Sequence, residues 1–111
     1  MTVSDLSDIS RLEASAAKAA SLLRAMSNER RLMILCRLGD GELQVAALQA
    51  SVGLSQSALS QHLAVLRDEG LVSARRDGQA AFYRIADPAA LRVIATLADI
   101  LCPPDLKGSK K

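Results

Sequence analysis

The most reactive side chains in the sequence are those of two cysteines, Cys36 and Cys102, and of a single histidine, His62. A thiolate can attack the sulfur of a disulfide or persulfide, and a neutral imidazole can bind a metal ion. No CxxC or HExxH motif accompanies these residues, and the sequence also lacks GxGxxG, GxxxxGKS/T and GxSxG motifs. We therefore expect no metal site, no cofactor and no enzymatic activity, and an imidazole that packs or contacts phosphate.

The two cysteines have two competing interpretations. They are too few for a disulfide-built scaffold, and a cysteine outside a disulfide is commonly buried as a small hydrophobe. Cys36 lies in line with the apolar residues of its predicted helix, and Cys102 continues the row Leu91, Ala95, Ala98. Periodicity alone thus favours two core cysteines. Since no signal-peptide pattern and no run of eighteen apolar residues occur, we expect a cytoplasmic protein with reduced thiols and no membrane contact.

A group of short polar side chains is suited to DNA. The residues from Val45 to Leu66 predict two helices joined by a short turn at Gly53, which is typical of a helix-turn-helix. The second helix exposes side chains that fit the major groove, where Gln and Arg read base edges. The candidate DNA contacts in and just before this helix are Ser55, Gln56, Ser57, Ser60, Gln61, His62 and Arg67. Polarity alone, however, is more often explained by a solvated helix face.

A basic hairpin, which we call the wing, follows directly and favours the DNA interpretation. Apolar and polar residues alternate on both sides of Asp77-Gly78, and Asp-Gly is a strong hairpin signal. Arg75, Arg76 and Gln79 surround the tip, where they can touch phosphates or a neighbouring minor groove. A helix-turn-helix followed by such a wing predicts binding to double-stranded DNA.

The composition is consistent with one small folded domain. The chain has 111 residues, of which half are apolar and 23% charged, so it can form a core. Aromatic residues make up only 2%, which argues against readers that stack bases on aromatic rings. The net charge of +2 depends on three lysines within the last five residues, so the pI near 8.8 does not itself indicate a nucleic-acid partner.

Apolar spacing predicts the elements that position these groups, and Asn28 and Ser55 are placed to cap two of the helices. Helices are expected over residues 10–26, 29–38, 45–52, 56–69 and 88–101, with two strands between the last two. This order, α-α-α-α-β-β-α, predicts a mainly α fold with a β-hairpin wing, a winged helix-turn-helix. Residues 1–9 are expected to be a flexible N-terminus, 10–102 the DNA-binding and dimerisation domain, and 103–111 a disordered basic tail. The last helix is apolar around much of its circumference and needs a partner surface.

Three stretches carry a family resemblance: residues 26–35 (MSNERRLMIL), 54–72 (LSQSALSQHLAVLRDEGLV) and 75–85 (RRDGQAAFYRI). They resemble the ArsR/SmtB repressors, and the similarity extends over about residues 10–102. The resemblance implies a homodimeric winged helix-turn-helix repressor that binds inverted-repeat operators. It also implies that the helices over residues 10–26 and 88–101 form the dimer interface.

Metal-sensing members of this family use ligands that this sequence lacks. The thiol pair of the arsenic and cadmium sensors lies in a Glu-Leu-Cys-Val-Cys type of stretch, where this chain has Gln44 and Ala46. The zinc sensors use Asp and His residues along the last helix, which here carries Asp99 and no histidine. Neither ligand set can be assembled from these residues.

The surroundings of the cysteines, ILCRL at residues 34–38 and ILCP at residues 100–103, resemble the dithiol subgroup of the family, of SqrR and BigR type. The resemblance implies that Cys36 and Cys102 of one subunit face each other, that reactive sulfur species bridge them, and that the bridged protein releases DNA. Two alternatives stay open. The same repressor could respond to peroxide or general disulfide stress, or the chain could be a winged-helix protein-interaction module with inert core cysteines.

Overall fold

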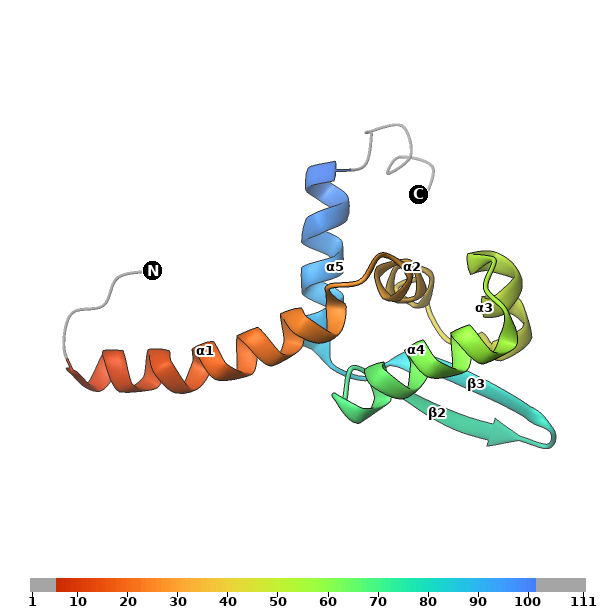
Figure 1. The fold of residues 1–111 in the computed structure, drawn as a ribbon, viewed down its shortest axis with the longest axis horizontal. Coiled ribbons are helices and arrows are strands. Elements are labelled where there is room, and N and C mark those ends of the chain that lie inside the picture. The colour runs from red at the N-terminus through yellow and green to blue at the C-terminus, as the bar shows by residue number, and fades with distance from the viewer. Residues whose placement is uncertain (1–5, 102–111) are drawn as a thin grey trace.

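A computed structural model describes residues 6–101 of the chain, with side chains from residue 8 onward (Figure 1). The expected mainly helical fold with a β-hairpin wing is confirmed. Cys102 and the tail over residues 103–111 lie outside the described residues. In chain order, the elements are α1 (Leu6–Met26), α2 (Glu29–Leu38), β1 (Leu43–Gln44), α3 (Val45–Val52), α4 (Gln56–Asp68), β2 (Val72–Asp77), β3 (Ala80–Ile85) and α5 (Pro88–Leu101).

Capping residues define the helix ends as the sequence predicts. The side chain of Asn28 accepts hydrogen bonds from the backbone N–H groups of Arg30 and Arg31, at 2.9 and 3.0 Å, and so begins α2. Gly53 ends α3 with a left-handed φ of 68°, and the hydroxyl of Ser55 accepts a backbone hydrogen bond at 3.2 Å at the start of α4. These two local features fix the turn of the helix-turn-helix.

Two boundaries differ from the prediction. Helix α1 begins at Leu6 rather than at residue 10, so residues 6–9 of the expected flexible N-terminus are helical. The carboxylate of Asp8 lies in the first turn, where it complements the helix dipole and pairs with Arg11 at 2.7 Å. The hairpin turn consists of Gly78 and Gln79, since Asp77 still belongs to β2. Gly78 has a φ of 65°, as a glycine at the first position of a type II′ turn requires.

A third strand was not predicted. β1 pairs antiparallel with β3 through Leu43 with Tyr83 and Gln44 with Phe82, which gives the strand order β1-β3-β2. A two-residue strand is too short to show an alternating pattern, so only its long-range partner identifies it.

The core lies between α2, α3, α4 and the base of the sheet. The helix-turn-helix contributes Leu48, Val52, Leu59, Leu63 and Leu66 to this core, and Leu54 is partly buried against it. The largest side chains that are fully buried are Ile34, Leu35, Leu48, Leu59, Leu66 and Leu71. The helix-turn-helix and the wing therefore rest on a core formed within one chain.

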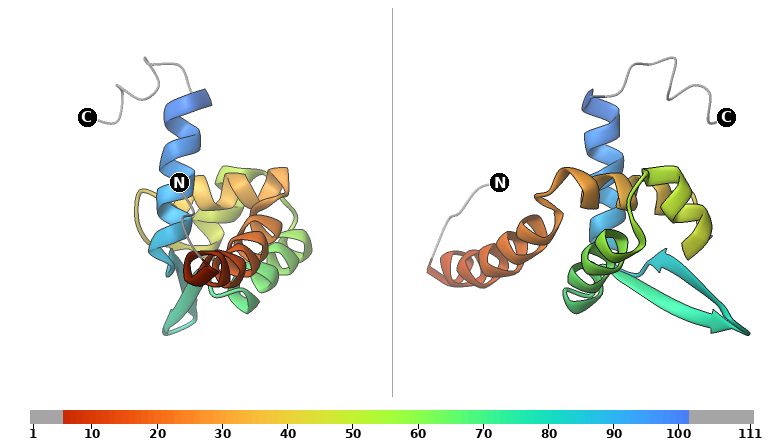
Figure 2. Two further views of the ribbon diagram at one scale, coloured as in Figure 1. Left: turned by 90° about the vertical axis from the view of Figure 1, so that its left-hand side faces the viewer. Right: turned by 45° about the vertical axis from the view of Figure 1, so that its right-hand side comes forward.

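Helices α1 and α5, which we call the arms, leave this core. The wing and α1 extend to opposite ends of the molecule, and α5 projects between them (Figure 2). In the described part of α1 only Ala25 and Met26 are buried, and in α5 only Ala90 and Ile94. No helix within residues 6–101 combines the length and the apolar character that a membrane span needs.

Candidate DNA-binding surface and thiol site

Helix α4 turns one face to the core and the other to solvent. Leu59, Leu63 and Leu66 are buried, as their spacing of three and four residues requires. His62 is half-buried at the edge of the outer face. The other candidate DNA contacts of this helix and its cap are all exposed: Ser55, Gln56, Ser57, Ser60, Gln61 and Arg67.

The exposed face has the chemistry of a major-groove reader. Its first residues are short and polar, which allows the helix to approach base edges closely. The first turn of α4 contains no acidic residue, so the positive end of the helix dipole is not neutralised there. Arg67 in the last turn adds a cation.

The wing is anchored at its base and exposed at its tip. Leu71 and Val72 are buried beneath it, and α4 packs against β2. The hairpin protrudes past α4 (Figure 1), with Arg76 and Gln79 exposed near its end. Within residues 6–101 no carboxylate forms a salt bridge with Arg76. The structure thus leaves both candidate contacts exposed on a hairpin that packs against α4 at its base.

Arg75 differs from its neighbour because its guanidinium is engaged within the chain. Its Nε and Nη2 donate hydrogen bonds to the two carboxylate oxygens of Glu42, at 2.8 and 2.7 Å. The Cζ atom of Arg75 also lies 4.5 Å from the centre of the Phe82 ring. These contacts hold the guanidinium by its edge and by its face.

This arrangement perturbs both charged groups. The hydrogen bond from Arg75 lowers the pKa of Glu42 below its ordinary value, and the more distant charge of Arg84 acts in the same direction. The hydrogen bond to Glu42 raises the pKa of Arg75. Glu42, Phe82 and Arg84 are not predicted from the sequence as members of this surface. Strand alternation could have placed Phe82 and Arg84 on one face with Arg75, but no local pattern reveals a partner 33 residues away.

Cys36 is exposed, and the interpretation of it as a core cysteine is wrong. Helix α2 buries Ile34, Leu35 and Leu38, and at about 100° per residue Cys36 lies on the opposite side of the helix. The thiol is therefore accessible from solvent in the last turn of α2. Its expected partner, Cys102, lies outside the described residues, so the pairing stays a prediction.

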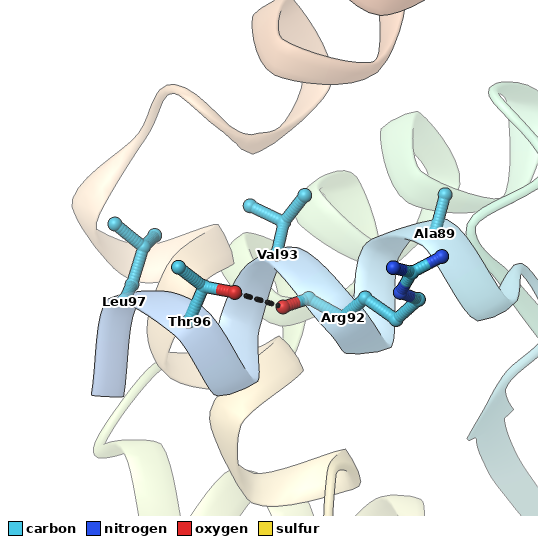
Figure 3. A pocket seen from close by; sticks show the side chains of 5 residues that line it. All are labelled: Ala89, Arg92, Val93, Thr96 and Leu97. Atoms are coloured by element: carbon cyan, nitrogen blue, oxygen red, sulfur yellow. Dashed lines mark hydrogen bonds between the residues drawn. The ribbon is translucent and has the colours of Figure 1, made fainter. Parts of the chain in front are cut away.

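Two further features of the described residues bear on ligands. No three His, Cys, Asp or Glu side chains within residues 6–101 come together as a metal site would require. A shallow depression on α5 is lined by Ala89, Arg92, Val93, Thr96 and Leu97 (Figure 3). All of these residues come from one helix, so the depression is a helix surface rather than an enclosed pocket.

Sequence comparison identifies relatives along most of the chain. The profile described as "Bacterial regulatory protein, arsR family" matches residues 28–74. The HTH-type transcriptional regulator YgaV of Escherichia coli is 46% identical over 99 residues, covering 88% of this chain and 100% of YgaV. The transcriptional activator HlyU of Vibrio cholerae is 47% identical over 95 residues, covering 86% of this chain and 88% of HlyU.

Solved structures agree with this relationship. Reduced HlyU from Vibrio cholerae matches with a TM-score of 0.80 at 48% identity, over 84% of this chain and 98% of HlyU. The transcriptional repressor BigR from Xylella fastidiosa matches with a TM-score of 0.80 at 37% identity, over 85% and 96% of the two chains. A homodimeric winged helix-turn-helix DNA-binding domain from Mycobacterium bovis, Mb0332, matches with a TM-score of 0.71 at 33% identity, over 90% and 89%. The chain therefore belongs to the ArsR family of helix-turn-helix transcriptional regulators, a non-enzymatic family of DNA-binding proteins.

Proposed function

We propose that this protein is a dimeric repressor that binds inverted-repeat operator DNA and releases it when reactive sulfur species bridge Cys36 and Cys102. The observation that carries the DNA-binding part is the exposed polar face of α4 beside the protruding wing. Ser60 and Gln61 read base edges, because they lie on this face and their side chains can both donate and accept hydrogen bonds. Arg76 and Gln79 contact phosphates from the wing, and the remaining contacts come from Ser55, Gln56, Ser57, His62 and Arg67.

The arms supply the dimer interface in this proposal. Ile100 and Leu101 are 66% and 74% exposed at the end of α5, and Leu23 of α1 is 53% exposed. Apolar side chains in such number on two helices are typical of a surface that a partner covers. A two-fold dimer places two copies of α4 in successive major grooves, which matches an inverted repeat. The homodimeric relative Mb0332 supports this arrangement.

The sensing part of the proposal rests on Cys36 and on the resemblance to dithiol repressors. Cys36 is exposed, so a small persulfide can reach its sulfur. Cys102 follows directly after the last residue of α5, and α2 packs against α5.

The chemistry is a sequence of thiol exchanges. Each cysteine thiolate attacks the terminal sulfur of an organic persulfide, takes that sulfur and expels a thiol. One cysteine persulfide then attacks the inner sulfur of the other, hydrosulfide leaves, and a bridge with one extra sulfur closes. In all, two persulfides are consumed and two thiols and one hydrogen sulfide are released. The two cysteines are oxidised, and the persulfide sulfur that leaves as hydrogen sulfide is reduced.

The packing of α2 couples the proposed bridge to the DNA-binding surface. Helix α2 contacts α3, α4 and α5, so a bridge between α2 and the end of α5 would act on the helix against which α4 packs. The hydroxyl of Ser21 in α1 also donates a 2.6 Å hydrogen bond to the carboxylate of Glu69 at the end of α4. A shift of the arms therefore changes the spacing of the two α4 helices. Such a bridge releases DNA only if it favours the state with lower DNA affinity.

The DNA-binding part is tested by selecting duplexes from a random-sequence pool with the wild-type protein. We expect enrichment of an inverted repeat whose half-sites are separated by about one helical turn or a multiple of it. The same binding should weaken steeply as salt is raised, because phosphate contacts release counterions. A pool that shows no enrichment, with binding that ignores ionic strength, would favour the protein-interaction module instead.

The sensing part is tested by mass spectrometry of the protein after treatment with an organic persulfide, hydrogen peroxide or oxidised glutathione. With the persulfide, we expect an intramolecular Cys36–Cys102 bridge with added sulfur mass and at least a tenfold loss of affinity for the selected duplex, about 1.4 kcal/mol. Cys36→Ser and Cys102→Ser should each bind DNA normally and lose the response. A single-cysteine variant that still responds would contradict the dithiol mechanism, and an equal response to peroxide would favour general disulfide stress.

A further inference from the structure

A long-range ion pair crosses the outer face of the three-stranded sheet. Arg75 belongs to β2 and Glu42 directly precedes β1, and these two strands are the outer members of the order β1-β3-β2. The bidentate hydrogen bonds between the two side chains therefore pass over β3. Both side chains must be held in one orientation for this planar, two-point contact.

Phe82 of β3 completes the arrangement. Its backbone is paired with Arg75 on one side and with Gln44 on the other, so these three side chains point to the same face of the sheet. The guanidinium stacks 4.5 Å from the centre of the Phe82 ring. The opposite face of the sheet packs against the core through Leu43, Tyr83 and Ile85. We refer to Glu42, Arg75 and Phe82 as the wing clamp.

The wing clamp joins the wing to the first helix of the helix-turn-helix. Glu42 lies in the short segment between α2 and α3, three residues before Val45 begins α3. β1 is only two residues long and supplies little pairing of its own. The contact between Glu42 and Arg75 therefore adds a second tie between the hairpin and this segment.

We propose that Glu42 and Arg75 are positioning residues that fix the wing relative to α4 for operator binding, and that Arg75 does not contact a phosphate. This inference rests on the proposed DNA-binding function. The carboxylate of Glu42 neutralises the charge of Arg75, whereas Arg76 next to it points to the other face of β2. The phosphate contact of the wing then comes from Arg76, and the sequence-based assignment of Arg75 to DNA is replaced by a role in orientation.

The direction in which Glu42→Gln changes DNA affinity separates a positioning role from a purely electrostatic one. Glu42→Gln removes a negative charge close to DNA and releases a cation, so simple electrostatics predicts tighter binding. Loss of the wing clamp predicts weaker binding, by about two- to fivefold, in line with the modest strength of an exposed ion pair. Tighter binding of Glu42→Gln would overturn the proposal.

A charge-matched double variant sharpens the test. Glu42→Gln with Arg75→Gln keeps the net charge of the chain, so a positioning role predicts weaker binding to the selected duplex with an unchanged salt dependence. A phosphate contact by Arg75 predicts that log Kd depends less steeply on log salt, by about 0.9 per contact. Arg76→Ala is the control that should show this flattening. The exchanged pair, Glu42→Arg with Arg75→Glu, should recover most of the affinity, and a further loss would contradict the wing clamp.

A second measurement does not depend on DNA. Hydrogen exchange of the backbone amides in β2 and β3 should become faster in Glu42→Gln, while exchange in α2 stays unchanged. Unchanged exchange in the wing would show that the ion pair holds nothing in place. If exchange responds but no duplex is selected by the wild-type protein, the wing clamp stands and the proposed DNA-binding function fails.

Discussion

The helix-turn-helix and the arms differ in how completely they bury their apolar side chains. The helices α2, α3 and α4 surround side chains that are almost completely inaccessible, such as Ile34, Leu48 and Leu66. The arms are comparably rich in apolar residues, but within residues 8–26 α1 buries only its last two side chains, and α5 leaves its end exposed. One half of the protein therefore completes its packing within a single chain, and the other half does not.

This difference indicates where a signal can act. A close-packed core transmits a displacement as a rigid unit, whereas a surface that depends on a partner can change its geometry at low cost. Cys36 is exposed on the side of α2 that faces away from the buried residues of this helix. In the mechanism proposed above, a bridge between Cys36 and Cys102 would move the arms relative to a core that itself stays intact.

The largest effect on stability should come from the core enclosed by α2, α3 and α4. Leu66→Ala should lower the free energy of unfolding by about 2–5 kcal/mol, because it leaves a cavity beneath α4. Urea denaturation followed by circular dichroism measures this loss. The adjacent Val65 is exposed on the same helix, so Val65→Ala serves as the control. Equal destabilisation by both substitutions would show that α4 is not held by its inner face.

The sequence predicts the helices of the helix-turn-helix better than the long-range contacts that surround them. Helix caps such as Asn28 and Ser55, and the leucine spacing of α4, are local signals that the structure confirms. The two-residue strand β1 and the pairing of Glu42 with Arg75 are not predictable in this way, because each depends on a partner more than thirty residues away. The apolar pattern of α2 predicts a buried Cys36, but only Ile34, Leu35 and Leu38 are buried and Cys36 is exposed.

Helix α4 and the wing should contribute differently to DNA binding, α4 to sequence discrimination and the wing to overall affinity. Gln61→Ala and Ser60→Ala should each reduce discrimination between the selected duplex and one mutated at a single base pair, by about 1–3 kcal/mol for a base contact. Arg76→Ala should instead weaken binding to both duplexes alike. Competition binding with the two duplexes distinguishes these outcomes. If Arg76→Ala changed the preference and Gln61→Ala did not, the wing would be the reading element.

A smaller effect is expected from the arms, and it should depend on protein concentration. Ile100→Ser should raise the dimer dissociation constant at least tenfold, about 1.4 kcal/mol, because each partner loses an apolar contact. Analytical ultracentrifugation over a range of concentrations measures the constant, and the helical content of the monomer should stay unchanged. Val65→Ser removes an exposed apolar residue that lies outside the arms and should leave dimerisation intact. Dissociation caused by Val65→Ser, and not by Ile100→Ser, would place the interface on α4.

The smallest effect concerns the wing clamp, where the contribution of an exposed ion pair depends on pH and salt. Because Arg75 lowers the pKa of Glu42 below its ordinary value of 4.5, the folded state binds a proton less readily than the unfolded chain. The stabilisation is therefore complete above about pH 4.5 and disappears as the pH falls through the lowered pKa. Wild type should unfold at slightly higher urea than Glu42→Gln at pH near 7, and the two should coincide in strong acid or in about 1 M salt, where the charges are screened. A difference that instead grew on acidification would mean that Glu42 stabilises the wing in its protonated form.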